Sequence, residues 1–145
     1  MKRTFFAFMA LVLVLISCSP KNQTTADMKP DAPLDNTRWK MVKIAGLDQF
    51  PTLEKDAFVQ FDKAANRFRG NAGCNNFTGG YTLNNGKLSL GPAAMTKMFC
   101  AGDGMKVEDL FSKMMATIDS YVIKGDHMVL KSGNKVVAEF EALYL

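Results

Sequence analysis

The stretch that decides the fold is residues 68–100, FRGNAGCNNFTGGYTLNNGKLSLGPAAMTKMFC. Its centre, residues 81–90, alternates apolar and polar side chains on both sides of Asn84-Asn85-Gly86. Asn and Gly tolerate the positive φ of a tight hairpin turn, so this centre predicts two antiparallel strands. Residues 70–76 predict a conformationally demanding bend before the hairpin, and residues 95–100 predict a further strand after it.

Short segments with the same period of two lie on both sides of this stretch. They predict strands over residues 39–46, 58–61, 67–70, 121–124, 128–131 and 136–143. One segment breaks the pattern, because its apolar side chains recur every three or four residues and predict a helix over 106–120. The apolar positions of that helix are Val107, Leu110, Phe111, Met114, Met115 and Ile118. The predicted fold class is α+β, a mostly antiparallel curled sheet of about eight strands with one main helix packed on it.

Eight residues of the deciding stretch match the pattern of a known family. They are Gly73, Cys74, Asn75, Gly80, Tyr81, Thr96, Met98 and Cys100. Because these residues occur in this order, the chain resembles the META domain, the family that includes the heat-shock-inducible HslJ proteins. The resemblance extends more weakly over residues 34–145. It implies a partly open, barrel-like sheet with a helix against it, and a place in the cell envelope with links to stress or virulence. It brings no agreed catalytic residues.

The N-terminus has the organisation of a bacterial export signal. Lys2 and Arg3 precede an apolar run over residues 5–16, which is too short to span a bilayer as a helix. Leu15-Ile16-Ser17-Cys18 resembles the lipobox at which the cysteine thiol receives lipid and the chain is cut before it. We therefore expect residues 1–17 to be a removed signal peptide and Cys18 to carry the lipid anchor. An ordinary signal peptide that contains a cysteine is the alternative.

The composition after Cys18 separates a tether from one domain. Residues 18–35 are rich in Ser, Pro, Asn, Thr and Lys, which predicts a flexible tether, and residues 36–145 hold the domain. The formal net charge of +4 includes Lys2 and Arg3, which leave with the signal. The remaining basic residues are scattered singly, so we expect no nucleic-acid partner.

Two cysteines remain in the domain, at Cys74 and Cys100. An exported protein sits in an oxidising compartment, so the pair predicts a disulfide. Two free buried thiols and a metal site are the alternatives. The sole histidine, His127, lies far from both cysteines in sequence, which disfavours a metal site.

Several polar or sulfur-bearing residues are candidate sites. Asn75 and Asn76 could bind a ligand. The alternative is structural, because amide side chains in such a bend can bond to nearby backbone. Met95 and Met98 near Cys100 could bind Cu(I), although methionine more often fills a core. His127 is expected in an exposed turn without a nucleophile beside it. We expect no catalytic residue, no cofactor and no metal.

These observations predict a non-enzymatic, lipid-anchored envelope protein, placed at the outer membrane because Ser19 rather than Asp follows Cys18. Its partner is expected to be another envelope component, and its role is expected to belong to a stress response. Two alternatives stay open. One is a carrier of a lipid or other small apolar ligand. The other is a hydrolase inhibitor that uses an exposed loop over residues 46–56.

Overall fold

The structure is a computed structural model that describes residues 30–144. The predicted signal peptide, Cys18 and most of the predicted tether lie outside these residues. The elements are β1 (Arg38–Ile44), β2 (Phe58–Asp62), β3 (Arg67–Asn71), β4 (Asn76–Asn84), β5 (Lys87–Met95), α1 (Gly104–Met115), β6 (Ser120–Lys124), β7 (His127–Ser132) and β8 (Lys135–Leu143). Among these described residues, no helix has the length and apolar character needed to cross a membrane.

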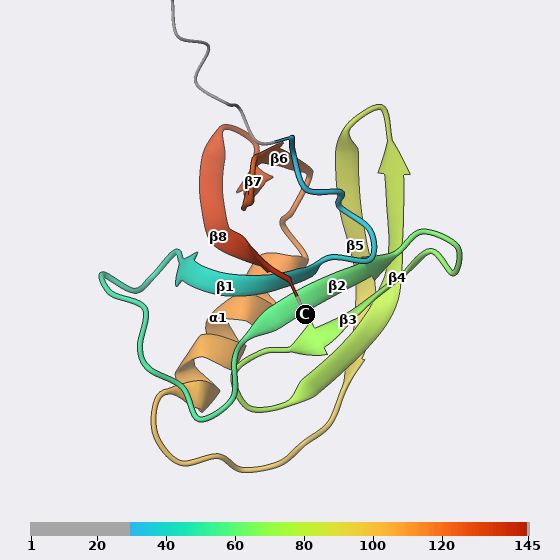
Figure 1. Ribbon diagram of the computed structural model, residues 1–145. Helices are drawn as coiled ribbons and strands as arrows, with labels where there is room; N and C mark the ends of the chain where they lie inside the picture. Colours follow the sequence, from blue (N-terminus) through green and yellow to red (C-terminus); the bar gives the residue numbers. More distant parts are fainter. Residues whose placement is uncertain (1–29, 145) are drawn as a thin grey trace, which may run out of the picture.

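The eight strands form one antiparallel sheet that curls into a ring. Each strand pairs with the next along the chain, and β8 pairs with β1 to close the ring (Figure 1). The contact between β5 and β6 is the weakest, because Lys87 opposite Ser120 is its single register pair. The predicted α+β class, with a curled antiparallel sheet and one helix, is therefore confirmed.

The hairpin at the centre of the deciding stretch forms as predicted. β4 ends at Asn84 and β5 begins at Lys87. The two residues between them, Asn85 and Gly86, have φ angles of 49° and 79°. Two successive positive φ values match the twist of the flanking strands, which is why this short turn closes the hairpin.

Large apolar side chains fill the inside of the ring. The bulkiest fully buried ones are Trp39, Phe61, Phe68, Phe111, Phe140, Met41, Ile44, Leu88, Met128 and Leu130. Most of them come from alternate strand positions, which point to one face of a sheet. The Trp39 indole N–H donates to the Leu34 carbonyl oxygen at 3.1 Å, so the one polar atom of this side chain is satisfied.

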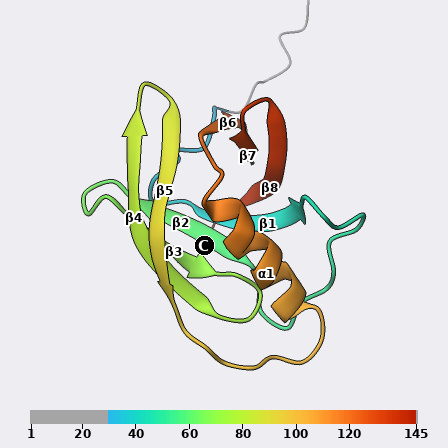
Figure 2. The ribbon, with the colours of Figure 1, turned by 180° about the vertical axis from the view of Figure 1, so that it is seen from behind.

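Helix α1 packs against the ring with the predicted apolar face. Its buried residues include Val107, Phe111, Met114 and Met115, and the Phe111 ring lies 4.9 Å from the Phe77 ring between centroids. Figure 2 shows α1 beside β5 and in front of β1. The predicted range of 106–120 was wrong at both ends. The chain turns after Met115 because the Thr117 N–H bonds to the Met114 carbonyl, and the Asp119 N–H then joins Lys131 of β7.

Residues 96–100 do not form the predicted strand, since β5 ends at Met95. The Thr96 N–H still bonds to the Asn76 carbonyl of β4 at 3.0 Å, but the Met98 backbone bonds to a side chain instead, as described below. The folded part also begins before residue 36. Ala32 and Leu34 are buried, and the Ala32 N–H bonds to the Gly125 carbonyl at 2.9 Å. The last residues of the predicted tether are therefore packed on the domain.

Candidate functional site

The bend before β4 is held by the side chain of Asn71. Its amide oxygen accepts from the Gly73 N–H at 2.8 Å, and its amide nitrogen donates to the Cys74 carbonyl at 3.2 Å. Gly73 has a φ of +103°, which side chains other than hydrogen rarely allow. The bend therefore presents Cys74 and Asn75 toward the residues that follow β5.

Asn75 is the centre of this arrangement and is only 1% exposed. Its amide oxygen accepts from the Met98 N–H at 2.7 Å and from the Thr96 hydroxyl at 2.8 Å. Its amide nitrogen donates to the Met98 carbonyl at 3.0 Å and to the Glu108 carboxylate at 3.1 Å. The Asn75 side chain thus joins the segment after β5 to helix α1, with every polar atom bonded inside the protein.

A disulfide completes the same cluster. Cys74 and Cys100 are bonded, with their Cα atoms 5.8 Å apart, as the cysteine pair predicted. Six of the eight family-motif residues therefore meet here. The other two, Gly80 and Tyr81, lie further along β4, where the Tyr81 ring packs edge-on against Phe61 at 5.2 Å.

Tyr81 has an electrostatic environment of its own, away from the bend. Burial raises the pKa of its phenol above the usual value, and the carboxylates of Asp35 and Asp62 raise this pKa further. The hydroxyl therefore stays neutral over the ordinary pH range. Nothing in this arrangement activates it as an acid or a nucleophile.

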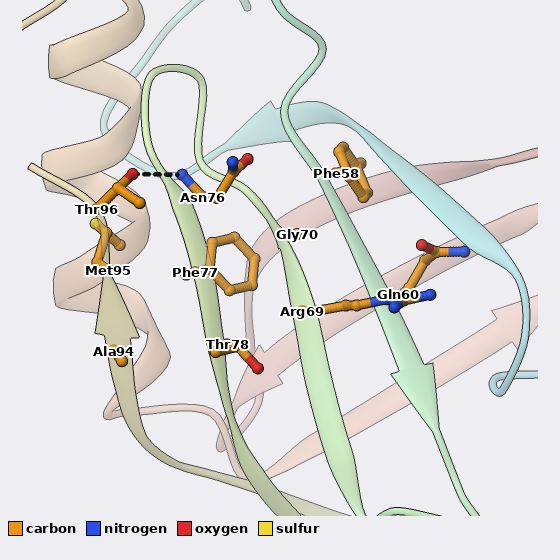
Figure 3. Close-up of a pocket in the computed structure, with 10 residues that line it drawn as sticks. All are labelled: Phe58, Gln60, Arg69, Gly70, Asn76, Phe77, Thr78, Ala94, Met95 and Thr96. Atoms are coloured by element: carbon orange, nitrogen blue, oxygen red, sulfur yellow. Dashed lines mark hydrogen bonds between the residues drawn. The ribbon is translucent and has the colours of Figure 1, made fainter. Parts of the chain in front are cut away.

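A groove of about 540 Å³ lies on the outer face of β2–β5, next to the bend (Figure 3). Its lining residues are Phe58, Gln60, Arg69, Gly70, Asn76, Phe77, Thr78, Ala94, Met95 and Thr96. The register explains its two walls, because residues paired across strands share a face. One wall follows the row Gln60, Arg69, Thr78 and Ala94, and the other follows Phe58, Asn71 and Asn76.

Gly70 forms the floor between these two walls. A Cβ atom at this position would lie 1.9 Å from the Phe58 carbonyl oxygen and 2.7 Å from Phe77 Cζ. The strands can therefore approach this closely only with glycine here. Figure 3 shows the Phe58 and Phe77 rings on the two sides of Gly70. On the β1 side, the Arg38 guanidinium lies 3.7 Å above the centre of the Phe58 ring.

This arrangement suits binding better than catalysis. The groove offers aromatic, methionine and threonine side chains and one guanidinium, Arg69, whereas a catalytic site needs an acid or base held next to a nucleophile. Within residues 30–144, no group of three or more His, Cys, Asp or Glu could hold a metal ion.

The sequence did not predict the groove. Residues 58–61 predict a strand, and the period of two places the Phe58 side chain on the face opposite Val59 and Phe61. An aromatic ring on the outer face of a strand was the available signal. The position of Gly70 beneath it depends on the register of three strands, which the sequence did not reveal.

The remaining candidates lie elsewhere. His127 is exposed and begins β7 instead of lying in the turn, with its Nδ1 4.0 Å from the Glu141 carboxylate. The loop over residues 46–56 does not project freely, because Leu47, Phe50 and Leu53 pack against the core.

The model of the META domain matches residues 32–143, which span the whole ring and its helix. The chain belongs to the META domain family. The match includes the bend, the disulfide and the groove, so all three are features of this META domain.

Two solved structures have a similar fold. One is the NMR structure of a protein from Burkholderia xenovorans, with 24% sequence identity and a TM-score of 0.61, covering 77% of this chain and 85% of that one. A second NMR structure has 20% identity and a TM-score of 0.59, covering 74% of this chain and 91% of the other. At these identities the likeness concerns the fold alone. A search of curated proteins found no significant match to this chain.

Proposed function

We propose that this META domain protein is a non-enzymatic lipoprotein of the cell envelope that binds another envelope component through the groove on β2–β5. The groove is the observation that carries the proposal. It combines the half-buried Phe58 ring with hydroxyl and amide side chains on an outer face, and the buried Phe77 ring lies beneath them. Such a surface can bury apolar side chains of a partner and still hydrogen-bond its backbone.

The sequence supports the envelope location. Leu15-Ile16-Ser17-Cys18 follows the lipobox pattern, and the disulfide between Cys74 and Cys100 suits an oxidising compartment. Lipid on Cys18 would hold the domain at a membrane, and Ser19 favours the outer membrane. A role in the stress response would agree with this location and with the family.

The anchor has a direct test. Cys18→Ser removes the thiol that would receive the lipid, so the intact mass of the variant should show no acyl chains. Intact mass of the wild-type protein should show an N-terminal Cys18 carrying acyl chains. A wild-type mass equal to the unmodified chain would refute the anchor without affecting the groove.

An apolar ligand inside the ring, the carrier alternative, has less support. The interior is filled by aromatic and aliphatic side chains, with Trp39, Phe68 and Phe140 fully buried. A small apolar ligand would therefore have to bind in the outer groove. The inhibitor alternative also has less support, since the apolar side chains of residues 46–56 pack on the core.

Site-specific photo-crosslinking in intact cells tests the groove. A photoreactive amino acid at Gln60 or Thr78, which line opposite sides of β3, should give one specific adduct. The same amino acid at Lys135, an exposed residue at the start of β8, is the matched control. Equal crosslinking at all three positions, or none at the groove positions, would overturn the proposal. Turnover of a substrate that a single groove substitution abolishes would overturn the non-enzymatic assignment.

A further inference from the structure

The methionines of the domain fall into two groups. Four of them, Met41, Met114, Met115 and Met128, are buried in the core. The other three, Met95, Met98 and Met105, together line one surface pocket of about 360 Å³. Met98 and Met105 are 46% and 38% exposed. Core packing explains the first group. In the second group Met95 is partly buried and packs against the core, whereas core packing does not account for the exposed side chains of Met98 and Met105.

We propose that Met95, Met98 and Met105 bind a soft monovalent cation, Cu(I) or Ag(I), through their thioether sulfur atoms. Thioethers are neutral, soft ligands that select Cu(I) over hard cations such as Mg²⁺ or Ca²⁺. Three such ligands from separate elements can surround one ion. Met95 also lines the groove on β2–β5, but the ion site does not depend on the partner-binding role of the groove.

The polar groups of the pocket are already engaged, which leaves sulfur as the available donor. Asn75 and Glu108 both line it, but the Glu108 carboxylate accepts from the Asn75 backbone N–H at 2.7 Å and from its amide at 3.1 Å. The Cys74 and Cys100 sulfur atoms are bonded to each other, so neither provides a thiolate. Lys97 and Glu108 bring opposite charges to the pocket, which leaves it close to neutral.

The backbone that carries the three methionines is held firmly. Met95 ends β5, and Met105 lies in the first turn of α1. Met98 exchanges two hydrogen bonds with the buried Asn75 side chain, at 2.7 and 3.0 Å. These bonds fix the Met98 backbone and so limit the positions open to its side chain. The side chains themselves are flexible, so their sulfur atoms can turn toward an ion.

Phe99 provides a further contact beside the sulfur atoms. Its side chain is 89% exposed and lines the same pocket. An aromatic face can attract a cation and shield it from water. An exposed phenylalanine at this position therefore fits a site that binds a weakly hydrated monovalent ion.

Methyl NMR of the full chain, purified in detergent with ¹³C-methyl methionine, locates the ion directly. The probe is Ag(I) in chloride-free buffer, because it needs no reductant and leaves the disulfide intact. Free thiols are first blocked with N-ethylmaleimide, so that Cys18 cannot contribute. The methyl signals of Met95, Met98 and Met105 should shift, while those of the four buried methionines stay in place as an internal control.

Affinity for Cu(I), measured by competition with bicinchoninate under ascorbate, gives the second readout. Met98→Leu should weaken binding by about tenfold or more, and the triple leucine variant should abolish it. Met114→Leu is the matched control and should bind as the wild type does. Leucine has nearly the volume of methionine, so these variants keep the fold.

Two results would overturn the site. One is binding that the triple leucine variant leaves unchanged. The other is a lack of any shift of the three methyl signals with Ag(I). Shifts caused by an apolar peptide but not by Ag(I) would instead identify the pocket as a protein-docking surface.

Discussion

Gly70→Ala tests whether the close approach of β2 and β3 defines the groove. The new Cβ would lie 1.9 Å from the Phe58 carbonyl oxygen, whereas real Cβ atoms essentially never come within 3.0 Å of such an atom. The strands would have to separate by about 1 Å at this point. Overpacking a well-packed site costs about 1–3 kcal/mol. The obstacle is a backbone carbonyl, and separating the strands also weakens the hydrogen bonds between them. We therefore expect a loss of about 3 kcal/mol in the free energy of unfolding.

Urea unfolding followed by tryptophan fluorescence measures this loss, since the buried Trp39 is the single tryptophan. With a typical slope, a loss of about 3 kcal/mol lowers the urea midpoint by about 2 M. Gly80→Ala is the matched control on the neighbouring strand, where the nearest atom to a new Cβ is 3.8 Å away. Its free energy of unfolding should change by less than about 1 kcal/mol. A Gly70→Ala protein as stable as the Gly80→Ala protein would refute the reasoning.

Three further predictions concern the bend and the turn before β8. Asn75→Ala should lower the free energy of unfolding by about 3–4 kcal/mol in urea, because Met98 N–H and the other partners lose buried hydrogen bonds; a loss below about 1 kcal/mol would contradict this. The double variant Cys74→Ala/Cys100→Ala should lose about 3–4 kcal/mol, from a loop closed over a separation of 26 residues, and an unchanged urea midpoint would contradict the disulfide. Hydrogen bonds from the Ser120 hydroxyl, and then from the Gly133 N–H, lower the pKa of Asp119. A carboxylate whose pKa is lowered in the folded state stabilises the fold at pH values above its ordinary pKa near 3.8. This stabilisation disappears as the pH falls through the lower pKa of the folded state. The Asp119→Asn protein should therefore be less stable than the wild type at pH 7, and its free energy of unfolding should decline less on acidification. Parallel profiles of this free energy against pH for the two proteins would contradict the contribution of Asp119.

Local signals predicted the regular elements well, and their ends less well. The hairpin turn at Asn85 and Gly86 needs only its own backbone angles, so the sequence was sufficient there. The apolar face of α1 was also predicted, but the helix ends at Met115 because the following residues join β6 and β7. Residues 96–100 have strand-like composition, yet the Asn75 side chain takes the hydrogen bonds of the Met98 backbone. Contacts between distant segments decided both outcomes.

The deciding stretch shows the same division for the site. By themselves, residues 68–100 determined the hairpin, the bend and the cysteine pair, because turn geometry and cysteine chemistry depend on neighbouring residues and compartment. The tertiary structure decided that Asn75 is a buried connector, that Gly70 opens a groove, and that three methionines share one pocket. These features arise from strand register and from the packing of α1 on the ring. Such long-range contacts bring together residues that no local pattern connects.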